Sequence, residues 1–90
     1  MKPRNTRGER LLKHAVAVMA KRTETYGPPR DAMIAVAKRW SLTLGVPVSA
    51  AQVALCLIDL KLTRLARDPK HLDSLVDVVG YAAMLRDVLR

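Results

Sequence analysis

Residues 49–83 read SAAQVALCLIDLKLTRLARDPKHLDSLVDVVGYAA. Ser49 followed three residues later by Gln52 matches the capping-box pattern that begins a helix. The apolar-rich run that follows ends before Pro69, because the residue preceding a proline is pushed out of the helical region. The pattern therefore predicts a helix over about residues 50–67.

A second apolar-rich run covers about residues 71–89 and, after so short a loop, must return antiparallel to the first. Before this hairpin the sequence predicts two more helices, over about residues 9–25 and from about residue 31 to Gly45. Gly27 and the two prolines after it separate them. The expected fold is all-α: a small four-helix bundle with a C-terminal helical hairpin.

Ninety residues form one domain, at a size where a single core is barely self-sufficient, so we expect a homo-oligomer. Residues 1–8 are basic and lack apolar periodicity, which predicts a flexible arm before a single helical domain over residues 9–90. The one cysteine, Cys56, favours a reducing, cytoplasmic setting. Lys13 and Lys21 interrupt the apolar N-terminal run, so we expect no membrane segment.

The formal net charge is +8, and residues 1–40 carry ten Lys or Arg against three acids. Such an imbalance favours contact with a polyanion without selecting which one. A sequence-nonspecific nucleic-acid site in this half of the chain would use Lys2, Arg4, Arg7, Arg10, Lys13 and Lys21.

The hairpin carries charges that its apolar faces do not explain. At 100° per residue, Lys61 and Arg64 project from a mostly apolar side of the third helix. Antiparallel pairing sets Lys61 opposite Asp77 and Arg64 opposite Asp73. These four side chains form either two ion pairs that fix the register or part of a small anion or metal site.

Two tyrosines accompany these charges. Tyr81 follows Gly80, a mid-helix glycine that costs about 1 kcal/mol relative to alanine and indicates close approach of another helix or of a ligand. Tyr26 lies in the turn TYGPP, where it either packs on the core or borders an anion at the next helix start. Trp40 is interpreted as a core residue rather than a base-stacking platform.

TYGPP at residues 25–29, Trp40, and the K-x-x-R and D-S-x-x-D-x-x-G-Y-A patterns from Lys61 to Ala82 resemble a family of small phage and prophage proteins of unknown function. The resemblance implies a phage origin, and hence the cytoplasm of the host cell.

More remotely, the string DSLVDVVGYA at residues 73–82 is similar to the last helix of MazG-like all-helical nucleotide pyrophosphohydrolases. Those enzymes hold Mg²⁺ with acidic pairs on two helices, and Asp77 matches their terminal aspartate. Ser74 stands where the partnering glutamate belongs, and Lys61 and Arg64 replace the acids of the preceding helix. Cations do not ligate Mg²⁺, so we expect no catalytic residues, cofactor or metal; if a metal bound at all, Asp73 and Asp77 would hold it.

The leading hypothesis is a phage accessory protein with a MazG-like scaffold that binds a nucleotide or small phosphorylated anion without hydrolysis. Its expected ligand-binding residues are Lys61, Arg64, Asp73, Asp77, Tyr81 and Tyr26. If the chain were an enzyme, the resemblance implies a Mg-dependent nucleotide pyrophosphohydrolase. The alternatives are the nucleic-acid binder described above and a structural or adaptor protein that contacts a host or phage factor.

Overall fold

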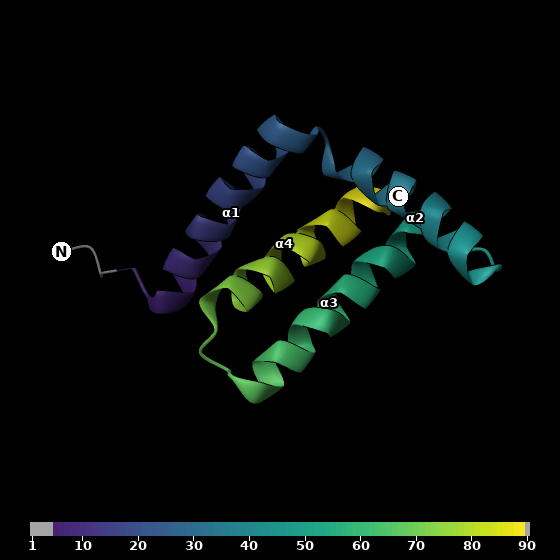
Figure 1. Ribbon diagram of the computed structural model, residues 1–90. Coiled ribbons are helices and arrows are strands. Elements are labelled where there is room, and N and C mark those ends of the chain that lie inside the picture. Colours follow the sequence, from purple (N-terminus) through teal and green to yellow (C-terminus); the bar gives the residue numbers. More distant parts are fainter. Residues whose placement is uncertain (1–4, 90) are drawn as a thin grey trace.

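Four helices and no strand make up residues 5–89, the part of the chain that the computed structural model describes (Figure 1). They are α1 (Arg7–Tyr26), α2 (Pro29–Leu44), α3 (Ala50–Arg67) and α4 (Leu72–Val88). The predicted all-α class and the C-terminal hairpin are confirmed. Helices α3 and α4 run side by side and antiparallel, α1 lies along α4, and α2 crosses the far end of the hairpin.

Helix α1 begins two residues earlier than the predicted boundary at Glu9. The Thr6 side chain accepts a hydrogen bond of 3.0 Å from the backbone N–H of Glu9 and so caps the first turn. Arg7 therefore belongs to the helix rather than to an arm. Lys2 and Arg4 of the predicted arm lie outside the described residues.

The turn TYGPP ends α1 and starts α2, as predicted. Gly27 has φ 83°, a conformation that favours glycine, and its N–H donates to the Thr23 carbonyl at 2.8 Å. Pro28 precedes α2 and Pro29 is its first residue, where a missing N–H costs nothing. Helix α2 accordingly starts at Pro29 rather than at Asp31.

The start of α3, the end of α3 and the start of α4 each have a local cause in the sequence. The Ser49–Gln52 capping box is present in both directions, with hydrogen bonds of 3.1 and 2.9 Å. Helix α3 ends at Arg67, as the proline at position 69 predicted. His71 is the cap of α4 rather than its first residue.

The core lies where α2, α3 and α4 meet. Met33, Ala37, Val53 and Met84 form its buried cluster, and Trp40 packs against them half-buried, which confirms the core interpretation of Trp40. The molecule is nevertheless elongated, with extents of 56 × 30 × 24 Å. Its radius of gyration of 14.9 Å exceeds the roughly 12 Å of a compact chain of this length. None of the described helices combines the length and apolarity needed to cross a bilayer.

Candidate functional site

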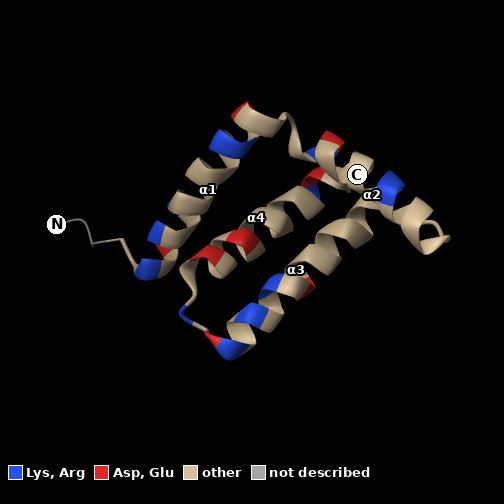
Figure 2. Ribbon diagram, in the orientation of Figure 1, with Lys and Arg blue, Asp and Glu red and all other residues tan. Residues whose placement is uncertain are grey.

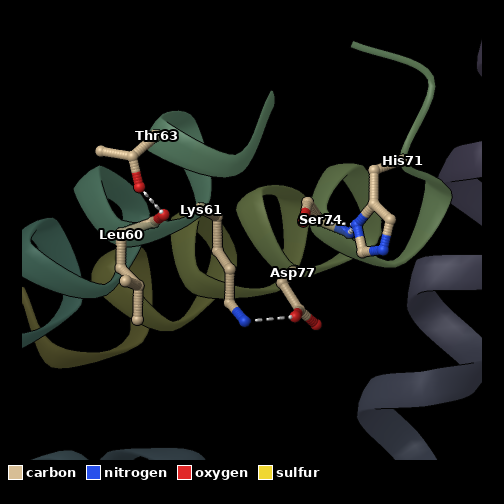
Figure 3. A network of polar contacts seen from close by, with 6 residues as sticks. All are labelled: Leu60, Lys61, Thr63, His71, Ser74 and Asp77. Carbon is tan, nitrogen blue, oxygen red and sulfur yellow. Dashed lines mark hydrogen bonds and ion pairs between the residues drawn. The ribbon is translucent and has the colours of Figure 1, made fainter. Parts of the chain in front are cut away.

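The predicted pair of Lys61 and Asp77 forms across the α3–α4 seam. The Lys61 Nζ lies 3.1 Å from the Asp77 Oδ2, and the two side chains are 12% and 26% exposed (Figure 3). Partial burial makes loss of either partner costly, because the remaining charge would stay partly desolvated without its counterion. The pair joins α3 to α4 at the register that the short loop predicted.

The second expected pair does not form. Arg64 and Asp73 are both exposed, and residues 5–89 contain no ion pair between them. The three residues from Lys61 to Arg64 turn α3 by about 300°, so Arg64 points some 60° away from the direction in which Lys61 reaches α4. The prediction placed Lys61 and Arg64 on the same general side of the helix, and this difference of about 60° is enough to keep Arg64 from Asp73.

Ser74, in the first turn of α4, is buried. Its side chain is 1% exposed, and its hydroxyl lies 2.7 Å from the His71 Nδ1 (Figure 3). The same nitrogen accepts the Ser74 backbone N–H at 3.3 Å, so the hydroxyl is the donor in the shorter contact. The contacts between His71 and Ser74 therefore cap the N-terminal end of α4.

Gly80 is buried where α4 meets α1. A Cβ built at Gly80 would lie 3.9 Å from the Met19 Cγ, which is ordinary van der Waals contact. The void that borders Gly80 and Asp77 measures about 10 Å³, room for no more than one water molecule. Gly80 therefore packs against α1 and does not face a ligand-sized space.

Tyr26 and Tyr81, 55 residues apart in the sequence, line one hollow of about 330 Å³. All four helices contribute to it, so the TYGPP turn and the Gly-Tyr-Ala segment of α4 meet in space. Its lining consists of Arg22, Thr23, Tyr26, Gly27, Pro29, Ala32, Met33, Leu57, Tyr81 and Met84. An apolar floor with aromatic and cationic walls at this volume suits a small organic anion.

Tyr26 does not pack on the core, which was one of its two expected roles. Its side chain is 74% exposed, and the Arg22 guanidinium carbon lies 5.9 Å from the centre of its ring. That distance is within the range of a cation–π contact. Tyr81, in contrast, packs half-buried against the core cluster.

The sequence-based reasoning missed Arg22. Arg22 and Tyr26 are four residues apart on one helix, a spacing that places two side chains on the same face, and this signal was available. The described residues give Arg22 no ion pair. Its charge is therefore available to a ligand in the hollow.

A larger groove of about 840 Å³ runs beside the outer half of α2, but it offers little chemistry. Apart from Lys38 its polar side chain is Ser41, whose hydroxyl donates to the Ala37 carbonyl and accepts the Val48 N–H, both at 2.8 Å. The hollow between the tyrosines is therefore the better ligand site.

Four of the six basic residues proposed for nucleic acid, Arg7, Arg10, Lys13 and Lys21, are exposed on α1, where Figure 2 colours Lys and Arg blue. At 100° per residue, Arg7, Arg10 and Lys21 lie within about 60° of one another around the helix, and Lys13 is next to them. Lys70, in the α3–α4 loop, lines the same shallow hollow as Arg7. The cationic surface of α1 thus continues onto the loop of the hairpin.

Asp73 and Asp77 do not belong to a metal-like cluster in the described chain. Between residues 5 and 89, His, Cys, Asp and Glu side chains form no group of three that could hold an ion. Asp77 is also paired with Lys61.

Neither the curated proteins nor the solved structures include a match to this chain. One family profile does match, over residues 10–89, and so covers the whole hairpin, the TYGPP turn and all but the first turn of α1. The chain therefore belongs to the family described as a domain of unknown function, DUF6378.

Proposed function

We propose that this protein binds a nucleotide or another small phosphorylated aromatic molecule, without hydrolysing it, in the hollow between Tyr26 and Tyr81. The observation that carries the proposal is the convergence of two tyrosines and Arg22, which has no ion pair among the described residues, on one space of about 330 Å³. Tyrosine rings stack on bases, and a guanidinium binds phosphate through paired N–H donors.

This site differs from the one expected on the hairpin. Lys61 is committed to Asp77, and Arg64 lies outside the lining of the hollow. Tyr26 and Tyr81 keep their proposed roles, while Arg22 takes the role expected of the two hairpin cations. The phage origin and the MazG-like scaffold belong to the same proposal and rest on the sequence resemblance alone.

A thermal-shift titration tests the proposal. Adenosine monophosphate, adenosine and inorganic phosphate are compared, because only the first offers both a base and a phosphate. A ligand at 100 times its Kd stabilises the native state by about 2.7 kcal/mol, a shift of roughly 10 °C or more for a domain of this size. If neither purine nor pyrimidine nucleotides raise the melting temperature, the proposal is wrong.

Matched arginine variants locate the site. Arg22→Gln should abolish the shift, whereas Arg64→Gln, which removes another exposed arginine without an ion pair in residues 5–89, should leave it intact. The reverse result would return the site to the hairpin. Incubation with nucleoside triphosphates and Mg²⁺ should release no pyrophosphate.

One observation favours nucleic-acid binding as the second candidate: Lys70 extends the cationic surface of α1 around Arg7. Counterion release predicts that log K falls with log salt concentration by about 0.9 per phosphate contacted. Arg7→Gln combined with Lys70→Gln should reduce that slope by nearly two, while Arg39→Gln on α2 should not change it. A slope near zero for the unmodified chain would eliminate this candidate.

A further inference from the structure

The chain exposes more surface than a monomer of its size needs. Its accessible area is 7028 Å², whereas a folded monomer of 10.0 kDa exposes roughly 5,200 Å². Subtracting roughly 970 Å², the most that residues 1–4 and 90 can expose, leaves an excess of about 900 Å². The question is where this excess lies and what covers it.

Part of this excess accessible area lies on α3. Ala51, Leu55, Ile58, Leu62 and Leu65 recur at alternating spacings of four and three residues, the repeat by which one helix packs along another. Leu55 and Leu62 remain 50% and 49% exposed, and the other three are half-buried. Within residues 5–89, α2 packs on the side of Val53, which lies about 160° around the helix from the centre of this α3 stripe, and so leaves the outer side of the stripe open.

Helix α4 carries a second stripe with the same repeat, formed by Leu75, Val78, Ala82 and Leu85. Its centre is about 180° from Val76, Gly80 and Met84, which face α1. Helix α1 packs on the Val76, Gly80 and Met84 side of α4, and α2 packs on the Val53 side of α3. At 100° per residue in two antiparallel helices, the two stripes lie on the opposite side of the hairpin and next to each other. Together they make one apolar hairpin face.

We propose that a second copy of this chain covers the hairpin face, so that two α3–α4 hairpins pack into an intermolecular four-helix bundle. The excess of about 900 Å² per copy includes other exposed apolar residues such as Leu42 and Leu44, so it sets about 1,800 Å² as the upper limit of what the hairpin face can bury in a dimer, within the standard size of a specific interface. Neither stripe contains a charged residue, although the chain carries +8. The cations of α1 lie on the other side of the hairpin, so two copies meet without opposing them.

This inference is independent of the proposed nucleotide site. The hollow of Tyr26 and Tyr81 opens among α1, α2 and the inner side of the hairpin, so the dimer leaves it accessible. The second copy adds a core that one chain of 90 residues builds only in part.

Sedimentation equilibrium of the full chain tests the proposal. The expected mass is about twice 10.0 kDa at micromolar concentrations. Leu62→Glu should reduce it to the monomer mass, or raise the dimer Kd at least 100-fold. Leu42→Glu is the matched control: this leucine of α2 is even more exposed, at 75%, but lies outside the hairpin face and should leave the dimer intact. A monomeric unmodified chain, or dissociation by Leu42→Glu alone, would overturn the proposal.

Leu62→Glu could unfold the chain, so a milder variant gives a second readout. In a Cys56→Ser background, Leu62→Cys should form an intermolecular cross-link with a short bis-maleimide in high yield, and Leu42→Cys should not. Cys56 is exposed and outside both stripes, so its replacement leaves the face unchanged. Equal yields at the two positions would contradict the assignment of the face.

Discussion

The α3–α4 seam and the hollow at the α1–α2 turn both carry charged and polar side chains, but those side chains are paired at the seam and exposed at the hollow. At the seam, the Lys61 charge meets Asp77 at 3.1 Å, and the buried Ser74 hydroxyl meets His71 at 2.7 Å. At the hollow, Arg22 and Tyr26 are exposed, and the Arg22 guanidinium lies 5.9 Å from the centre of the Tyr26 ring. Polar groups that are paired and buried define the fold, whereas exposed ones can exchange their partners for a ligand without unfolding the chain.

The largest expected effect on stability is at Lys61. Lys61→Ala leaves the half-buried Asp77 carboxylate without its cation, and we expect the free energy of unfolding to fall by about 2 kcal/mol, between the values for exposed and fully buried pairs. Urea denaturation at one fixed protein concentration measures it. Arg64→Ala on the same helix should cost less than about 0.5 kcal/mol. Equal losses would mean that the pair does not stabilise the seam.

Register within the hairpin was predictable because a capping box, a proline and a short loop leave one alignment of α3 and α4. The Arg64–Asp73 pair was predicted wrongly because the helical repeat gives the angle between Lys61 and Arg64 but not the direction in which α4 lies. The hollow was out of reach for another reason. Tyr26 and Tyr81 meet only through the way α1 packs along α4, and periodicity within each helix does not encode that packing.

A smaller effect is expected at the cap of α4. His71→Ala removes the acceptor of both the Ser74 hydroxyl and the Ser74 N–H, and should lower the free energy of unfolding by about 1 to 1.5 kcal/mol. The measurement is again urea denaturation. His14→Ala, an exposed histidine in the middle of α1, serves as the control and should have little effect. A neutral His71→Ala would show that the seam tolerates an unpaired buried hydroxyl.

Gly80→Ala should act in the opposite direction. The added Cβ fits at 3.9 Å from Met19, so the higher helix propensity of alanine should raise the free energy of unfolding by about 0.5 to 1 kcal/mol. Nucleotide affinity should not change, because the void at Gly80 is too small for a ligand. A destabilised variant would show that α1 lies closer to α4, and a selective loss of affinity would move the ligand to this position.

Tyr26→Ala separates the two regions most cleanly, because its effect on stability should be the smallest. A side chain that is 74% exposed contributes little to the folded state, and we expect a change below about 0.5 kcal/mol in the free energy of unfolding. Loss of one stacking tyrosine costs about 1 to 3 kcal/mol of binding, roughly a 5- to 150-fold rise in the Kd of adenosine monophosphate measured by calorimetry. Tyr81 cannot give this result, since it also packs against the core and its loss would mix both effects. If Tyr26→Ala binds as the unmodified chain does, Tyr26 is a bystander of the α1–α2 turn, and the hollow loses the wall that distinguishes it from an ordinary surface depression.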